Sequence, residues 1–213
     1  MSGILHKSQI KYLESLRKEK SELILKMEKY AEENRIPILD WKSAEFLETL
    51  IQSLRPKKVL EIGTAIAYSS IRMARSIRKK GFIDTIEKSK DNIVLALEFI
   101  EMSGFGEKIN IIKGDALEII PKLECKYDLI FLDADKEDYE KLFDFSMKKL
   151  KKKGVIIIDN LLWKGYAGSS EVPDKYKNST ESVRNFNIYF LANEKLFSTI
   201  LPIGDGIGIG VKL

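Results

Sequence analysis

The stretch "YDLIFLDADKEDYEKLF", Tyr127–Phe143, joins an apolar run directly to a run of charged residues. The apolar part is typical of a buried strand, and the part that follows is typical of a helix start. Two interpretations of Asp133 and its neighbours remain open at this point. Either they form a solvated turn ahead of a helix, or they are functional residues placed at the end of a strand.

Similar apolar runs recur on both sides of this stretch. Residues 59–63, 82–87, 109–114, 127–133 and 154–160 are expected to be strands. Residues 69–80, 91–104, 115–123 and 136–153, which lie between them, are expected to be helices. Near-continuous apolar strands that alternate with amphipathic helices indicate an α/β fold, with a parallel sheet covered on both faces.

The flanking segments extend this pattern into one domain over residues 1–213, in which residues 1–36 form a helical extension. Apolar spacing over 4–33 predicts one or two leading helices, which the residue before Pro37 ends. Asp40 is expected to cap a helix that runs through Ile51. A last helix over 180–193 and a hairpin of 196–204 with 207–213, turning at 204–206, complete the prediction.

Composition excludes several classes of protein. The chain has 213 residues, 44% hydrophobic and 32% charged, and no window of about 18 apolar residues that would predict a membrane span. The N-terminal residues lack the apolar core of a signal peptide, and the single Cys125 excludes an internal disulfide, so a cytoplasmic location is expected. The single His6 disfavours a histidine-based catalytic or zinc site.

The net charge of +4 is a mild bias toward anionic partners. Basic residues cluster in "RKEK" (17–20), "RMARSIRKK" (72–80) and "KKLKKK" (148–153). These clusters are solvated helix faces, or they attract an RNA backbone in a salt-dependent way.

Polar residues follow each expected strand. In a parallel sheet, ligands bind beyond the carboxyl ends of the strands, so these residues should meet at one edge. They are Glu61, Gly63 and Thr64 on the first strand, Glu87 on the second, Asp115 on the third, Asp133 and Asp135 on the fourth, and Asp159 and Asn160 on the fifth.

The first of these strand ends, "VLEIGTAIAYSS" (59–70), is a strand, a loop of small residues and a helix start. It does not match the dinucleotide pattern G-x-G-x-x-G, because Ala65 and Ile66 stand where glycine is needed. Glu87 could accept the two hydroxyls of a ribose. The alternative is that Glu87 caps the following helix.

Asp133, Asp159 and Asn160 offer oxygen ligands from two strands. Such a set suits Mg²⁺, which keeps water or substrate oxygens in its remaining positions. Asp135 either joins this group or only caps the next helix. Lys136 near a cation would have a lowered pKa, which suits a base. The alternative for Lys136 is an ion pair with Glu140, four residues along the helix.

The motifs "VLEIGTAIAYSS", "TIE", "GDALEIIP", "FLDADKEDY" and "DNLLWKG", in this order, resemble those of the class I S-adenosylmethionine methyltransferases. More narrowly, the chain resembles the metal-dependent catechol and caffeoyl-CoA O-methyltransferase group over residues 35–213. "IPILDWKSAEFL" and "LPIGDGIGI" are similar to the bacterial tRNA 5-hydroxyuridine methyltransferases of that group. The resemblance implies a Rossmann-like fold, with a mainly parallel seven-stranded sheet and an antiparallel C-terminal hairpin.

The resemblance also implies roles for single residues. Glu61, Gly63 and Thr64 would approach the methionine part of the cofactor, Ser69 its carboxylate, Glu87 the ribose, and Asp115 with Ala116 the adenine. Asp133 would contact both the cofactor and the metal, which Asp159 and Asn160 would also bind. Lys136 would take the proton of the acceptor hydroxyl. One position departs from the family pattern, because Ala67 replaces the usual glycine at the end of the loop.

Two acceptors fit this chemistry. The first is 5-hydroxyuridine at the wobble position of a tRNA anticodon, with Mg²⁺ or Mn²⁺ bound to its adjacent oxygens. The phosphate backbone would be held by basic residues of the first helices and by Arg35, Lys42 and Lys164. The second is a small catechol-like or hydroxycinnamoyl acceptor. Trp163 could stack on a base or an aromatic ring, or it could only pack the loop.

The tRNA enzymes can carry a strongly basic segment after the Trp-Lys-Gly loop. Here that segment reads "YKNSTESVRNF", with fewer charges. A nucleotide-binding fold without chemistry is a third alternative, against which the set of Asp133, Lys136, Asp159 and Asn160 argues. The resemblance further implies a homodimer and no membrane partner.

Overall fold

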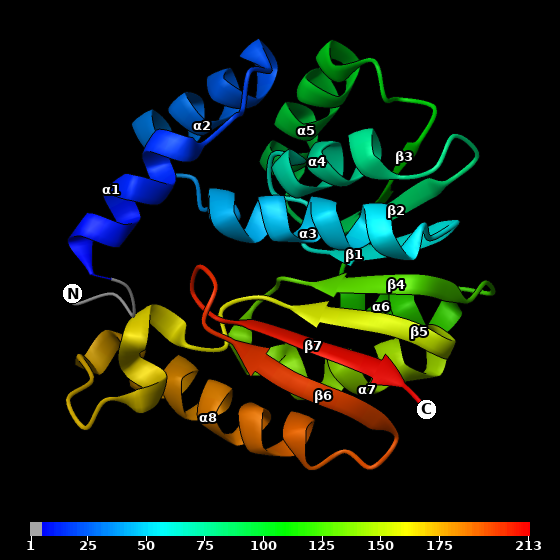
Figure 1. Ribbon diagram of the computed structural model, residues 1–213. Helices are drawn as coiled ribbons and strands as arrows, with labels where there is room; N and C mark the ends of the chain where they lie inside the picture. Colours follow the sequence, from blue (N-terminus) through cyan, green and yellow to red (C-terminus); the bar gives the residue numbers. More distant parts are fainter. Residues whose placement is uncertain (1–5) are drawn as a thin grey trace.

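A computed structural model describes residues 6–213 of the chain. Its centre is a seven-stranded sheet in the order β3-β2-β1-β4-β5-β7-β6, shown in Figure 1. The strands are β1 (Lys58–Ile62), β2 (Phe82–Glu87), β3 (Ile109–Lys113), β4 (Tyr127–Leu132), β5 (Leu150–Ile158), β6 (Leu196–Leu201) and β7 (Ile207–Lys212). The first five are parallel, and β7 pairs antiparallel with both β5 and β6. This is the mainly parallel seven-stranded sheet with an antiparallel C-terminal hairpin that the sequence predicted.

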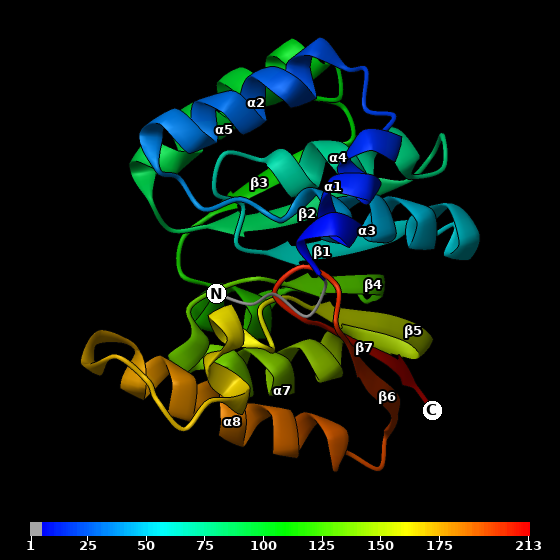
Figure 2. The same ribbon diagram turned by 60° about the vertical axis from the view of Figure 1, so that its left-hand side comes forward.

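Helices cover both faces of the sheet (Figure 1). They are α1 (Lys7–Leu16), α2 (Glu22–Asn34), α3 (Trp41–Leu54), α4 (Tyr68–Ser76), α5 (Lys90–Ser103), α6 (Ala116–Ile119), α7 (Tyr139–Lys149) and α8 (Lys177–Leu191). Helices α3, α4 and α5 lie on one face, and α6, α7 and α8 on the other. Figure 2 shows α2 running beside α5, where Tyr30 and Phe99 pack edge to face with ring centroids 5.7 Å apart.

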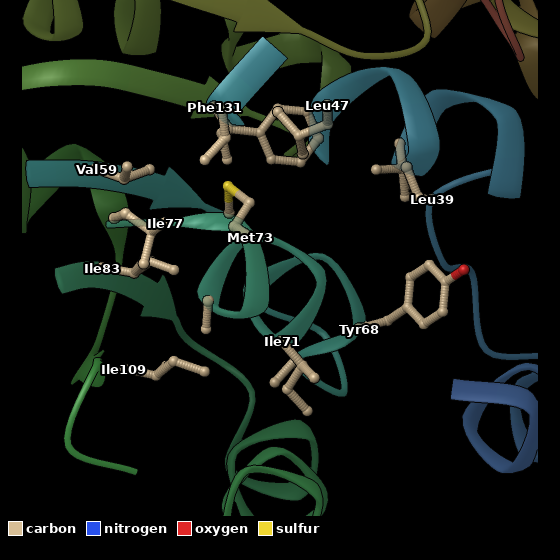
Figure 3. Close-up of a cluster of buried hydrophobic side chains, with 14 of the residues drawn as sticks. Leu39, Leu47, Val59, Tyr68, Ile71, Met73, Ile77, Ile83, Ile109 and Phe131 are labelled. Atoms are coloured by element: carbon tan, nitrogen blue, oxygen red, sulfur yellow. The ribbon is translucent and has the colours of Figure 1, made fainter. Parts of the chain in front are cut away.

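Successive residues of each central strand belong to different cores. Val59 packs with α3 and α4, as Figure 3 shows, whereas Leu60 packs with the α7 and α8 side. Phe131 and Leu132 divide in the same way. Alternate side chains of a strand point to opposite faces, so a sheet covered on both sides needs apolar residues at every position. The continuous apolar runs of the sequence follow from this.

The N-terminal helices are tied to α4, the helix that follows the first strand-end loop. The guanidinium of Arg72 on α4 is fully buried and binds Glu48 at 2.6 Å and Glu19 at 3.5 Å. The hydroxyl of Tyr68 donates a 2.5 Å hydrogen bond to Glu28 on α2. A buried guanidinium needs such partners, because an uncompensated charge there would be strongly destabilising. The leading segment is therefore joined by ionic contacts to the helix beside the candidate site.

The expected elements are present, with shifted boundaries. Two leading helices form, and positions 4 and 5 of the predicted range lie outside the described residues. The helix expected over 136–153 ends at Lys149, and β5 begins at Leu150 rather than at 154. Leu150 is fully buried and pairs with Tyr127, so packing overrides the helical reading of the lysine run. The three lysines that follow it belong to the strand.

Other helices differ by a few residues. Helix α4 ends at Ser76 instead of 80, since Ile77 is extended, and α8 spans 177–191 instead of 180–193. The helix expected over 115–123 is a short α6 followed by a 3₁₀ turn that contains Pro121. Proline lacks the amide hydrogen that an α-helix would use there. Within residues 6–213, no helix is long and apolar enough to cross a membrane.

Candidate active site

A cavity of about 550 Å³ opens at the carboxyl ends of the parallel strands. It lies where the sequence predicts ligand binding, because the loops after the five parallel strands meet there. The residues of the predicted site that line it are Gly63, Glu87, Asp115, Ala116, Asp133, Asp135, Lys136, Asp159, Asn160, Trp163 and Lys164. Three predicted residues, Glu61, Thr64 and Ser69, do not line it.

The loop after β1 approaches the fourth strand end so closely that it requires glycine. Gly63 has a φ of +99°, and a Cβ atom there would lie 1.9 Å from the carbonyl oxygen of Asp133. Ala65 and Ala67 also have positive φ values, 46° and 65°. Ala67 therefore has a left-handed backbone conformation, which costs an alanine some strain.

Glu61 lies beneath this loop and is fully buried. Its carboxylate accepts hydrogen bonds from the hydroxyls of Ser69, Ser70 and Thr85. Burial raises the pKa of Glu61 to about 7, and the three hydroxyls offset part of that effect. Thr64 is also buried, with its hydroxyl 2.6 Å from that of Thr85. Glu61, Ser69 and Thr64 thus support the loop through their side chains and do not line the cavity. Their contact with the cofactor stays a prediction.

The next two strand ends form the opposite wall of the cavity. The Glu87 carboxylate accepts the backbone N–H groups of Ala65 and Ser89, both at 2.8 Å. Asp115 accepts the N–H of Leu117 at 2.8 Å and caps α6. Each of these hydrogen bonds leaves carboxylate lone pairs available to a ligand. Glu87 therefore combines the two alternatives, because it binds the start of the next helix and also faces the cavity.

Asp135 does not cap the following helix. Its side chain makes no capping hydrogen bond and instead pairs with Lys88 at 2.6 Å. Both residues line the cavity, and both side chains are more than half exposed, so this ion pair crosses its open side. Exposed pairs of this kind contribute little to stability.

The metal ligands that the sequence predicts come together on neighbouring strands. Asp133 and Asp159 directly follow β4 and β5, which pair in parallel. The backbone N–H of Asp159 donates to Leu132 at 3.1 Å, so the ladder continues to the site. Asn160 has a φ of 60°, a turn that asparagine adopts more readily than most residues. Asn160 ends the strand at the cavity wall.

The surroundings of Asp159 suit a carboxylate that binds a cation. Only 4% of its surface is exposed, and its Oδ1 has no hydrogen-bond partner among the described residues. Burial, together with the nearby charge of Asp133, raises the pKa of Asp159 well above its usual value. A buried carboxylate beside a second, partly exposed one is costly unless a cation or a proton compensates the charge.

The donor set indicates the kind of cation. Across residues 6–213, no group of three or more His, Cys, Asp or Glu side chains is arranged to hold a metal. The set here is two carboxylates and one amide. This fits a hard divalent cation that keeps water or substrate oxygens in its other positions, and it does not fit zinc.

Lys136 lies beside this group and is largely buried. Its Nζ is 3.2 Å from Asp133 and donates a 2.8 Å hydrogen bond to the carbonyl of Ala134. Its ion pair is thus with Asp133, three residues back, and not with Glu140. Burial alone would lower the pKa of Lys136, but its contact with Tyr139 and the charge of Asp133 raise it above the usual value. The protein groups alone therefore do not lower the pKa of Lys136, and the lowering that the sequence analysis expects requires a nearby cation.

The tip of the C-terminal hairpin completes the cavity, which the sequence analysis missed. Asp205 lines the cavity and accepts the N–H of Lys164 at 2.5 Å. Backbone N–H groups of Leu161 and Leu162 bond to Gly206 and Asp205 at 3.0 and 2.8 Å. The Gly-Asp-Gly turn at 204–206 was the available signal in the sequence. The loop that it contacts, at Lys164, lies 41 residues earlier in the chain.

The loop after β5 carries an aromatic side chain that packs against Lys136. Trp163 and Lys164 have φ values of 45° and 57°. Lys136 lies over the Trp163 ring, 5.6 Å from its centroid, and Trp163 packs edge to face on Tyr176 at 6.2 Å. The hairpin bonds described above hold this strained loop in place.

The O-methyltransferase family model matches residues 8–213. The chain belongs to this family. It is 31% identical over 173 residues to the caffeoyl-CoA O-methyltransferase of Stellaria longipes, covering 78% of this chain and 72% of that protein. The caffeoyl-CoA O-methyltransferase of Populus kitakamiensis is 29% identical over 176 residues, covering 79% and 75%.

Solved structures of similar proteins share the fold. A Staphylococcus aureus crystal structure is 30% identical, with a TM-score of 0.89, and the match covers 95% of this chain and 98% of that one. The O-methyltransferase TomG of Streptomyces achromogenes, solved in complex with S-adenosylmethionine, has a TM-score of 0.85 at 24% identity, with 100% and 99% covered. The chain is thus a member of the O-methyltransferase family, and it shares its fold with TomG.

Proposed function

We propose that this enzyme methylates one of two adjacent oxygens of its acceptor with the help of a divalent cation. The observation that carries the proposal is the pair of carboxylates Asp133 and Asp159, one of them buried with an oxygen that has no partner among the described residues. Asn160 adds the third oxygen ligand. Mg²⁺ or Mn²⁺ is the cation that this set favours.

The residues divide the work between the two ends of the cavity. Glu87 and Asp115 would hold the nucleoside part of S-adenosylmethionine, with Ala116 against the adenine, and Gly63 leaves room for the methionine part. The cation, when bound, lowers the pKa of the hydroxyl that it ligates and fixes its direction. Lys136, whose Nζ lies 3.2 Å from Asp133, would take the hydroxyl proton once a bound cation has lowered its own pKa.

The first acceptor that we propose is 5-hydroxyuridine of a tRNA anticodon. Its adjacent oxygens can chelate one cation, and the chain is basic, with a net charge of +4. Lys164 at the cavity wall is a candidate for a phosphate contact. The ring of Trp163 is a candidate for stacking on a base.

A small hydroxycinnamoyl or catechol-like acceptor is the second candidate. The names of the Stellaria longipes and Populus kitakamiensis relatives favour it. The same cation site would serve its two adjacent hydroxyls. The cavity volume of about 550 Å³ has to accommodate both the cofactor and the acceptor.

One experiment separates the two acceptors. The purified enzyme, labelled S-adenosylmethionine and Mg²⁺ are incubated either with bulk tRNA from a strain that lacks this protein or with caffeoyl-CoA. Label in tRNA digests at a methoxyuridine supports the first acceptor. Transfer to caffeoyl-CoA alone would overturn the tRNA proposal, and transfer that survives chelation of all divalent cations would overturn the metal proposal.

A further inference from the structure

A second hollow lies at the opposite edge of the sheet, where the parallel strands begin. It has a volume of about 370 Å³ and is bordered by the end of α3 and the starts of β1, β4 and β5. These ends of the four elements lie on the right of Figure 1. Six cationic side chains and one carboxylate line it: Arg55, Lys57, Arg78, Lys151, Lys152, Lys153 and Asp128.

The fold builds this hollow from separate basic parts of the sequence. Arg78 belongs to the cluster at 72–80, and the three lysines 151–153 belong to the cluster at 148–153. Arg55 and Lys57 come from the turn between α3 and β1. Arg55 and Lys153 both have left-handed backbone conformations, with φ values of 50° and 62°. The proposed catalytic chemistry, at the other edge, uses none of these residues.

The single carboxylate does not cancel this charge. Asp128 Oδ2 accepts the backbone N–H groups of Lys57 and Lys58 at 2.8 and 2.9 Å, and Oδ1 binds Lys151 at 2.7 Å. Its oxygens are thus engaged in joining β1 to β5. Within residues 6–213, Lys151 is the one cation of the six that forms an ion pair. Five exposed cations therefore surround the hollow without a carboxylate partner.

We propose that this hollow binds the phosphodiester backbone of an RNA. Lysine and arginine side chains recognise phosphate without reading base edges, and converging cations attract a polyanion more strongly than a single ion. Strands of about six residues separate this edge from the cavity by roughly 20 Å, so one RNA could occupy both. The proposal does not depend on methyl transfer, since RNA binding is measured without it.

Helix ends offer a different reason for these cations. Helices α3 and α4 finish next to the hollow, at Leu54 and Ser76, and their carbonyl ends attract positive charge. Under that explanation, removal of the cations lowers stability and leaves RNA affinity unchanged. The two explanations therefore predict opposite results for the same variant.

The test is the double variant Arg78→Glu with Lys152→Glu, which changes one residue of each basic cluster. Binding of a fluorescent, unmodified tRNA transcript is followed by anisotropy at several salt concentrations. We expect an affinity at least about ten-fold lower, and a salt slope smaller by roughly 1 to 2, since two phosphate contacts are lost. Thermal unfolding is recorded in parallel.

The control carries the same change in charge elsewhere. Lys113→Glu with Lys141→Glu alters two exposed lysines, on β3 and α7, that belong to none of the three basic clusters and do not line the hollow. If both double variants lose affinity equally, net charge and not the hollow binds RNA, and the proposal is wrong. It is equally wrong if the first variant binds as the wild type does, or if tripolyphosphate displaces the tRNA at matched phosphate concentration. Failure of tRNA methylation with this binding intact would overturn only the proposed acceptor.

Discussion

The two edges of the sheet contrast in how they use charge. At the carboxyl edge, buried acids face a cavity, and their positions are fixed by backbone hydrogen bonds and left-handed residues such as Gly63 and Asn160. At the amino edge, the charges are exposed cations that surround a shallower hollow. The first arrangement orients a few atoms closely, as chemistry requires. The second attracts an anion without fixing its position.

Two matched substitutions, one at each edge of the sheet, test this contrast with the largest expected effect. Asp159→Ala should lower kcat at least about 100-fold, or roughly 3 kcal/mol in the activation barrier, because a cation ligand is lost. Methyl transfer at saturating cofactor measures this. Cofactor affinity, measured by calorimetry, should change less than about three-fold.

Asp128→Ala is the control at the amino edge. It removes the same group and should lower thermal stability, since three hydrogen bonds are lost, while kcat stays within about three-fold. Equal losses of kcat in the two variants would contradict the division of labour between the edges.

Two glycine substitutions test the close approach at the cavity. Gly63→Ala should lower the free energy of unfolding by roughly 3–5 kcal/mol, because its Cβ would lie 1.9 Å from the Asp133 carbonyl in a left-handed conformation. Gly104→Ala, where no atom lies within 4 Å, should cost only about 1 kcal/mol of backbone strain. Urea unfolding measures both. Similar costs would show that the loop moves freely away from Asp133.

Glu61 should give the protein a pH-dependent stability. Its pKa is about 7 in the folded protein and 4.5 when unperturbed, so the native state binds more protons between these values. The free energy of unfolding should therefore fall as pH rises from 4.5 to 7, by roughly 3 kcal/mol in total from this group. Urea titrations across this range should show that Glu61→Gln lacks this component. The slope should persist in Glu107→Gln, a change at an exposed site, and an unchanged slope in Glu61→Gln would refute the assignment.

The smallest effect is expected at the exposed ion pair across the cavity opening. Lys88→Ala removes the partner of Asp135, but both side chains are more than half exposed. The melting temperature should shift by no more than about 2 °C, and the cofactor Kd should change by less than about three-fold. A ten-fold change in that Kd would show that the pair acts as part of the cofactor site.

The sequence predicted the sheet and most of the cavity for a physical reason. Parallel strands must be apolar on both faces, so their ends stand out as the first polar residues, and Glu87, Asp115, Asp133 and Asp159 all line the cavity. Side-chain direction was not predictable in this way. Glu61 lies within β1 and not at its end, so it points beneath the loop. Asp205 was missed because its contact with Lys164, which is distant in the sequence, forms only through tertiary packing.

The central claim is that Asp133, Asp159 and Asn160 hold a divalent cation at the carboxyl edge. Calorimetric titration of Mn²⁺ or Mg²⁺ into the enzyme saturated with S-adenosylhomocysteine tests it directly. The account predicts one site per chain in the wild type, and none in Asp159→Ala at the same protein concentration. Binding of equal affinity in the two proteins would contradict it.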